Sequence, residues 1–132
     1  MPALNAFIVE DSPVIRENLI AALEELAPVK VVGTAEDEPT AVSWLGSDRS
    51  CDLVIIDIFL KRGSGLGVLR AASELKRPMS LVVLSNYATP DMRRKCLELG
   101  ASRVFDKSNE IDALIQNCAR LAEGETSPTP LS

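Results

Sequence analysis

The chain has 132 residues, 19 acidic and 14 basic side chains, a formal net charge of −5 and no histidine. Its length corresponds to one domain, and 46% hydrophobic residues against 25% charged ones exclude a disordered chain. Without histidine, the chain cannot build a Ser–His or Cys–His nucleophile, a histidine-ligated zinc site or a phosphohistidine.

Four short apolar runs and a weaker fifth one predict β-strands. Residues 53–56 and 81–84 are unbroken apolar runs rich in β-branched side chains, which is typical of strands buried on both faces of a parallel sheet. The predicted strands are residues 6–9, 29–33, 53–56, 81–84 and 103–106.

Helical patterns separate these runs. Ser12 before Pro13 predicts an N-cap with proline at the first helical position, and Pro28 ends that helix. Gly100 is expected to end the fourth helix. The predicted helices are residues 13–27, 39–45, 66–75, 90–100 and 111–121.

Strands and helices alternating in this way predict an α/β fold of type (βα)5. We expect a doubly wound, five-stranded parallel sheet in the flavodoxin-like order 2-1-3-4-5. Residues 1–124 form the predicted domain, and the polar segment 125–132 is expected to be a disordered tail or linker stub. Such sheets bind ligands outside the carboxyl ends of their strands.

Chemically reactive side chains follow those carboxyl ends. The first strand leads into Glu10 and Asp11, the third into Asp57, the fourth into Ser85 and the fifth into Lys107. Strands one and three are neighbours in the predicted order, so three carboxylates converge, and hard oxygen ligands suit Mg²⁺. Each residue alone also fits a solvated turn, a helix cap or a surface lysine, but their joint occurrence favours a site.

The surrounding motifs resemble the receiver domain of two-component response regulators (CheY-like). The matching segments are FIVEDSP, LVIIDIFLKRGSGLGVL, VVLSNY and GASRVFDKS. The resemblance extends over about residues 5–121. The spacings of 28 residues from Asp57 to Ser85 and 22 from Ser85 to Lys107 are close to those of the family.

The resemblance implies that Asp57 accepts a phosphoryl group from a sensor histidine kinase or a phosphotransfer protein. Lys107 and Ser85 then contact the phosphoryl oxygens. The implied Mg²⁺ ligands are Glu10, Asp11, Asp57 and the backbone carbonyl of Phe59. In the family, phosphorylation reshapes the surface of the fourth helix, fifth strand and fifth helix, and partner proteins respond. The chain is therefore expected to be a phosphoacceptor with slow self-dephosphorylation, not a turnover enzyme.

The sequence departs from the family pattern in two places. Val104 stands where receivers usually carry an aromatic switch residue. Phe105 beside it points to the opposite sheet face by strand alternation, so we interpret it as core. Lys61 replaces a common proline, which predicts a less constrained loop after Asp57. The glycines of that loop (Gly63, Gly65 and Gly67) are interpreted as turn residues.

The resemblance implies that two bulky side chains flank the proposed site. Phe59 and Tyr87 lie two residues beyond Asp57 and Ser85, and neither is a strong base. One hypothesis is that they restrict attacking water and prolong the phosphorylated state. The alternative, that they merely cover apolar surface, stays open.

Other functions fit the sequence less well than a receiver. An aspartate-nucleophile phosphatase needs a second acid where Phe59 stands, and a flavodoxin-like cofactor binder does not explain the carboxylates. A receiver that docks proteins without phosphorylation stays open. The chain is expected to be either a stand-alone receiver, which we favour, or the front domain of a larger regulator.

Charge and composition also predict the surroundings of the protein. The acidic balance predicts no direct nucleic-acid or membrane partner, and residues 93–95 are interpreted as the solvated basic face of a helix. No apolar run approaches the ~20 residues of a membrane span, and MPALNAFIVED lacks a signal-peptide pattern. Cys51, Cys96 and Cys118 are expected to be reduced thiols of a cytoplasmic protein.

Overall fold

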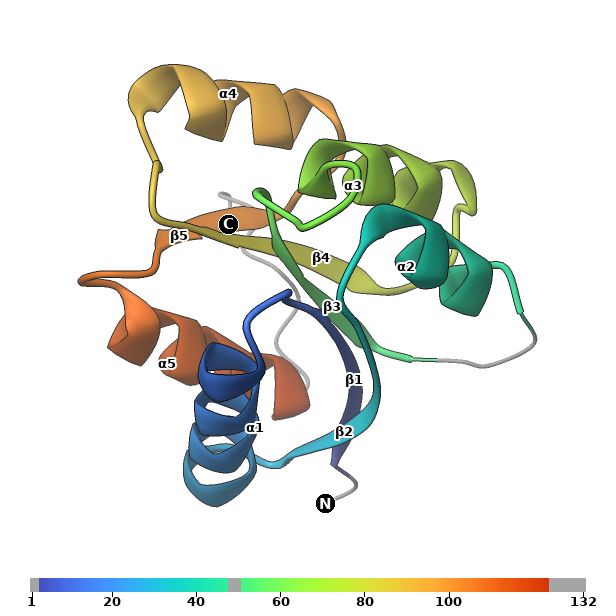
Figure 1. Cartoon of the computed structure of the whole chain (residues 1–132). Coiled ribbons are helices and arrows are strands. Elements are labelled where there is room, and N and C mark those ends of the chain that lie inside the picture. Colours follow the sequence, from blue (N-terminus) through green and yellow to red (C-terminus); the bar gives the residue numbers. More distant parts are fainter. Residues whose placement is uncertain (1–2, 48–50, 124–132) are drawn as a thin grey trace.

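The computed structural model describes residues 3–47 and 51–123. In this part of the chain, five strands alternate with five helices (Figure 1). The strands are β1 (Leu4–Val9), β2 (Val29–Ala35), β3 (Leu53–Asp57), β4 (Ser80–Ser85) and β5 (Arg103–Asp106). The helices are α1 (Pro13–Leu26), α2 (Glu38–Leu45), α3 (Gly65–Glu74), α4 (Pro90–Glu98) and α5 (Ile111–Ala122).

The strands form one parallel sheet in the order β2-β1-β3-β4-β5. The predicted doubly wound α/β fold and its strand order 2-1-3-4-5 are therefore confirmed. Val9 of β1 pairs with Ile56 of β3, and Asp57 pairs with Leu84 of β4. The carboxyl ends of the three central strands thus lie side by side.

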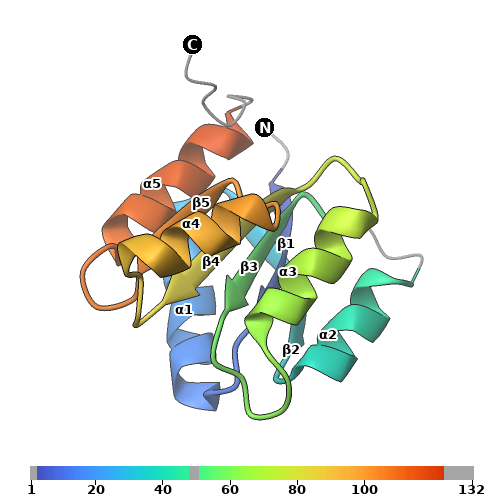
Figure 2. The same ribbon diagram turned by 90° about the horizontal axis from the view of Figure 1, so that it is seen from above.

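Helices cover both faces of the sheet. Helices α1 and α5 lie on one face, and α2, α3 and α4 lie on the other (Figures 1 and 2). Val104 packs into the core under α2, α3 and α4, whereas Phe105 packs into the core under α1 and α5. The predicted alternation of these two side chains is confirmed, and Phe105 is a core residue with 3% of its surface exposed.

Element boundaries differ from the predictions by one or two residues. Strand pairing extends past the apolar runs, so β1 begins at Leu4 and β2 continues to Ala35. Helices α2 and α3 each begin one residue earlier than predicted because a polar side chain caps them. The caps of the first four helices accept hydrogen bonds from the first turn, and they are Ser12, Asp37, Ser64 and Thr89.

Two further expectations concern the cysteines and the tail. Cys51, Cys96 and Cys118 are free thiols, as predicted, and the last two are buried. Burial raises the pKa of the Cys118 thiol to about 12, so this side chain stays protonated in the core. The predicted disordered tail, residues 125–132, lies outside the described residues.

Candidate functional site

Three carboxylates meet at the carboxyl edge of the sheet. Glu10 and Asp11 follow β1, and Asp57 ends the neighbouring strand β3. The backbone N–H of Glu10 donates to Ala35 at the end of β2, which fixes where the acidic pair leaves the sheet. Each acid offers one oxygen, and these three oxygens lie within 4.8 Å of one another. Glu10 and Asp57 are buried, with 2% and 6% of their surfaces exposed.

Lys107 lies directly against two of these acids. Its backbone N–H donates to the carbonyl of Ser85 at 2.9 Å, which ties the segment after β5 to the end of β4. Its Nζ lies 2.7 Å from Glu10 Oε1 and 3.2 Å from Asp57 Oδ2. Glu10, Asp11, Asp57 and Lys107, separated by up to 97 residues of sequence, therefore form one cluster.

The charges of this cluster perturb one another. Burial raises the pKa of Asp57 to about 6; the charge of Glu10 adds to this rise and Lys107 opposes it. Burial, followed by the neighbouring Glu10, also raises the pKa of Asp11. Burial tends to lower the pKa of Lys107, but its bonds to Glu10 and Asp57 outweigh burial, so this pKa is raised. Three acids against one ammonium leave an excess of negative charge, and their hard oxygen donors fit a divalent cation such as Mg²⁺.

Ser85 ends β4 one residue beyond the Asp57–Leu84 pair and is fully buried. Its Oγ accepts a hydrogen bond from the backbone N–H of Tyr87 at 3.0 Å. Because Oγ is the acceptor there, the hydroxyl hydrogen is free to be donated elsewhere. The alternative interpretation of Ser85 as a helix cap is wrong, because Thr89 caps α4.

Phe59 and Tyr87 form an aromatic pair beside the acids. Their ring centroids lie 5.1 Å apart in an edge-to-face arrangement, and 53% and 62% of their surfaces are exposed. The backbone N–H of Phe59 points to Asp57 Oδ1 at 3.4 Å. The pair thus connects the loop after β3 with the loop after β4.

The loop after β3, residues 58–64, is held by the start of α2. Ser64 N–H donates to Glu38 Oε1 at 2.9 Å, and Glu38 N–H donates to the carbonyl of Arg62 at 3.0 Å. Arg62 also pairs with Asp37 at 2.8 Å. These contacts tie the loop to α2, and the expectation of a less constrained loop at Lys61 stays a prediction.

Glycines in this loop serve different purposes. Gly63 adopts a φ of +81°, so it is the turn residue that the sequence predicted. Gly65 has no such backbone; instead, a Cβ there would overlap the carbonyl oxygen of Asp57. Gly67 similarly lies against the carboxylate of Glu38. The interpretation of Gly65 and Gly67 as turn residues is therefore wrong, because both permit close packing.

Sequence reasoning missed two arginines near the site. Arg16 donates to the carbonyl of Glu10 at 2.9 Å. Arg93 was assigned to a solvated basic face, but its guanidinium binds two backbone carbonyls and Glu110. The solvated interpretation fits its neighbour Arg94, which is exposed. Neither Arg16 nor Arg93 belongs to a sequence motif that could have marked it.

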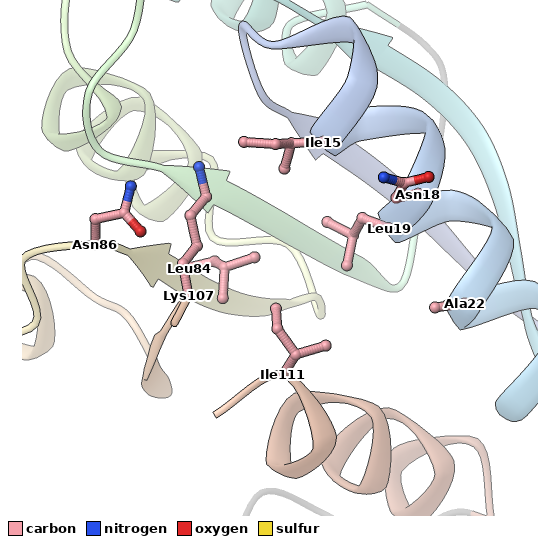
Figure 3. A pocket seen from close by; sticks show the side chains of 8 residues that line it. All are labelled: Ile15, Asn18, Leu19, Ala22, Leu84, Asn86, Lys107 and Ile111. Carbon is pink, nitrogen blue, oxygen red and sulfur yellow. The ribbon is translucent and has the colours of Figure 1, made fainter. Parts of the chain in front are cut away.

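A cavity of about 420 Å³ lies next to Lys107, between α1 and α5. Figure 3 shows the apolar side chains of both helices around it, with the Lys107 chain along one wall. Its lining residues are Ile15, Asn18, Leu19, Ala22, Leu84, Asn86, Lys107 and Ile111. The site is therefore bordered by an open, largely apolar hollow.

In the described part of the chain, every helix is too short or too polar to cross a membrane.

Comparison with known proteins gives a consistent result. A family model described as the response regulator receiver domain matches residues 6–119. The transcriptional regulatory protein YdfI of Bacillus subtilis is 25% identical over 93% of this chain and 57% of its own length. The chain thus spans little more than half of that relative.

Solved structures share the fold. A two-component response regulator of the LuxR family from Aurantimonas sp. SI85-9A1 has a TM-score of 0.83 at 23% identity, with 96% of this chain and 91% of that chain covered. A response regulator protein from Burkholderia pseudomallei, solved with a phosphorylated aspartic acid, calcium ion and citrate, has a TM-score of 0.74 at 19% identity. That match covers 93% of this chain and 73% of the other.

Proposed function

The chain belongs to the response regulator receiver family, and we propose that it accepts a phosphoryl group on Asp57 and signals through altered protein contacts. One observation carries the proposal: the Lys107 ammonium lies 3.2 Å from an oxygen of the buried Asp57 carboxylate. The relative whose structure contains a phosphorylated aspartic acid supports the same chemistry. The partner is a phosphodonor, and we propose a sensor histidine kinase or a phosphotransfer protein. This chain has no histidine, so any phosphohistidine in the transfer belongs to the partner.

Mg²⁺ is the proposed cofactor. Glu10, Asp11, Asp57 and the backbone carbonyl of Phe59 would hold it, and the close approach of the three carboxylates supports this set. When bound, the ion neutralises charge on the carboxylates and on the incoming phosphoryl oxygens. Burial is the main cause of the raised pKa of Asp57, and the charge of Glu10 adds to it, so a bound cation would favour the ionised carboxylate.

Each side chain of the site has its own role in the proposed phosphoryl transfer. Asp57 supplies the nucleophilic oxygen: a carboxylate O–P bond forms as the donor's N–P bond breaks. Transfer of this kind depends on positioning and charge stabilisation more than on nucleophile strength. Lys107, already within reach of Asp57 and Glu10, neutralises negative charge on the phosphoryl oxygens. The Ser85 hydroxyl donates a hydrogen bond to one of them.

The phosphorylated state is proposed to decay slowly by hydrolysis, without turnover of an external substrate. In this proposal Phe59 and Tyr87 restrict the access of water to Asp57, which the contact between their rings supports. A cytoplasmic location is part of the proposal, since the phosphodonors of the family act there.

Two alternatives lead to different experiments. A receiver that docks proteins without phosphorylation would use the same surface but would not need Lys107 at Asp57. If the chain is part of a larger regulator, as the partial coverage of YdfI allows, the receiver chemistry is unchanged and the output lies in the remaining sequence.

The test is incubation with Mg²⁺ and acetyl phosphate, followed by intact-mass analysis. We expect one added phosphoryl group, absent in Asp57→Asn and retained in Asp91→Asn, which removes an exposed acid of α4. If the unaltered protein gains no phosphoryl group and does not bind beryllium fluoride, the docking module is the better description.

A further inference from the structure

Arg93 lies in α4 and extends its guanidinium to three acceptors. Its Nε donates to the carbonyl of Ala88 at 2.9 Å, and its Nη1 donates to the carbonyl of Val104 at 2.9 Å. Its Nη2 pairs with Glu110 Oε1 at 2.8 Å. A planar guanidinium with donors in a fixed fork can hold three acceptors in one arrangement, which a lysine cannot.

The positions of these acceptors relate Arg93 to the phosphoryl site. Ala88 lies three residues after Ser85, and Val104 lies three residues before Lys107. Arg93 therefore bridges the two chain segments that carry Ser85 and Lys107 into the site. The same two segments are joined closer to the site by the bond from Lys107 N–H to the Ser85 carbonyl.

The third acceptor links this bridge to α5. Glu110 precedes Ile111, the first residue of α5, and its Oε1 also accepts the backbone N–H of Asp106 at 2.8 Å. The hydrogen bond from Arg93 holds the pKa of Glu110 below its ordinary value, so Glu110 stays charged at neutral pH. The loop after β4, the end of β5 and the start of α5 thus meet at one guanidinium.

Ser85 gives this bridge a way to respond to the phosphoryl group. Its Oγ accepts the Tyr87 N–H in the present structure. If the Ser85 side chain rotates about its Cα–Cβ bond to bring the hydroxyl to a phosphoryl oxygen, Oγ moves away from the Tyr87 N–H, so that bond weakens and residues 86–89 are released on the site side. Their other side stays bound to Arg93 through Ala88. The side chain at position 104 is a buried valine, so it has no polar group that could form a new hydrogen bond when residues 86–89 move.

We propose that Arg93 is a positioning residue that keeps residues 86–89 in register with β5 and α5 and carries a displacement at Ser85 to the start of α5. In this chain the coupling passes through the carbonyl of Val104 and the carboxylate of Glu110. The inference rests on the proposed function, because the displacement starts from phosphorylation of Asp57.

The test compares backbone amide NMR shifts before and after addition of beryllium fluoride and Mg²⁺. In the unaltered protein, both residues 86–89 and residues 110–112 at the start of α5 should shift; Lys107 is left out because it contacts the site directly. In Arg93→Ala, the response of 86–89 should persist, whereas that of 110–112 should be lost. Arg93→Lys keeps the charge without the fork and should show the same loss. The matched control is Arg94→Ala on the same helix, which removes an exposed ion pair with Asp91 and should leave both responses intact.

Each outcome decides between a coupling and a purely structural role. If Arg93→Ala lowers the melting temperature but residues 110–112 still shift fully, Arg93 merely stabilises the fold and the inference is wrong. If Arg93→Lys alone retains the full response, charge suffices and the fork is not the device. If the unaltered protein itself fails to respond, the proposed function fails and the inference with it.

Discussion

Two loops flank Asp57, and they are held by contacts with different parts of the fold. The loop after β3, residues 58–64, is bound by α2 through Glu38 and Asp37, and Gly65 closes it against the backbone of Asp57. Within the described part of the chain, residues 86–89 form hydrogen bonds with Ser85, with the first turn of α4 and with the Arg93 side chain. We infer that the first loop is a fixed platform for Asp57, whereas the second moves when the bond at Ser85 changes.

The strongest way to break this contrast is to disturb the fixed loop at Gly65. In Gly65→Ala, the added Cβ meets the Asp57 carbonyl oxygen and the backbone of Ile58. Because backbone cannot move aside as a flexible side chain can, we expect a loss near the upper end of the ~1–3 kcal/mol typical of overpacking. Urea denaturation measures the free energy of unfolding.

Gly46→Ala is the matched control. A Cβ there lies 3.4 Å from the nearest atom, the carbonyl oxygen of Val42, and the backbone φ of −80° suits any residue. We expect a change within ~0.5 kcal/mol. Equal losses for Gly46→Ala and Gly65→Ala would contradict a platform closed by Gly65.

Asp57, the residue before the fixed loop, has a strongly raised pKa. The pKa of Asp57 is about 6 in the folded protein, against an ordinary 3.8, so the folded state holds this proton more tightly than the unfolded chain. Stability therefore falls as pH rises from about 4 to about 6. A shift of this size corresponds to at most about 3 kcal/mol. Because Asn also loses the contact with Lys107, we expect Asp57→Asn to stabilise the metal-free protein by about 1–2 kcal/mol at neutral pH.

Urea denaturation in the presence of a chelator, near pH 7 and near pH 4, checks this prediction. The advantage of Asp57→Asn should shrink near pH 4, where Asp57 is protonated in the folded protein, and also when Mg²⁺ is added at neutral pH. Equal stability of the two proteins at neutral pH would show that the charge of Asp57 is already compensated.

A smaller effect is expected where α2 anchors the fixed loop. Asp37 caps α2 and binds Arg62, and the hydrogen bonds from Thr40 and then from Arg62 lower its pKa to about 2. The stability that the ionised Asp37 contributes is present above about pH 4 and is lost as pH falls toward 2. Asp37→Ala should lower the melting temperature by about 3–6 °C at neutral pH, as measured by circular dichroism. The difference in melting temperature between the two proteins should become smaller in acid.

Arg62→Ala separates the two contacts of Asp37. It removes the ion pair of an exposed arginine but leaves the cap on Thr40, so its effect should be smaller than that of Asp37→Ala. If Arg62→Ala proves as harmful as Asp37→Ala, the ion pair and not the cap anchors the loop.

The contrast between the loops also separates what the sequence could predict from what it could not. Buried parallel strands are apolar runs, so the residues following them could be assigned to one edge of the sheet; Glu10, Asp57 and Lys107 do meet there. The alternation of Val104 and Phe105 follows from strand geometry alone. These are local patterns whose consequences are fixed by secondary structure.

Loop anchoring depends instead on contacts between distant segments. Two of the acceptors of Arg93 are backbone carbonyls, and every residue carries a carbonyl, so no side-chain pattern marks them. Gly65 is required by a close approach that exists only after α3 has packed on β3. Asp37, two residues before Pro39, fits the pattern of a helix cap, although it was not among the predicted caps; no pattern marks its contact with Arg62.

The smallest effect on stability is expected at the contact between the two loops. Phe59 belongs to the fixed loop and Tyr87 to the movable one, and their rings meet edge to face. Because 62% of Tyr87 is exposed, Tyr87→Ala should change the free energy of unfolding by no more than ~0.5 kcal/mol. If the pair restricts water, however, the phosphorylated protein should lose its phosphoryl group severalfold faster, measured by intact mass after acetyl phosphate is removed.

Two further variants show which side of the contact limits water. Tyr87→Phe keeps the ring and should decay at the unaltered rate, whereas Phe59→Asn removes the opposite ring and should accelerate decay as Tyr87→Ala does. No acceleration in either ring-removing variant would show that the pair only covers apolar surface. Acceleration by Phe59→Asn alone would assign control of water to the fixed loop. In that case the movable loop would serve to transmit the signal through Arg93 and would not set its duration.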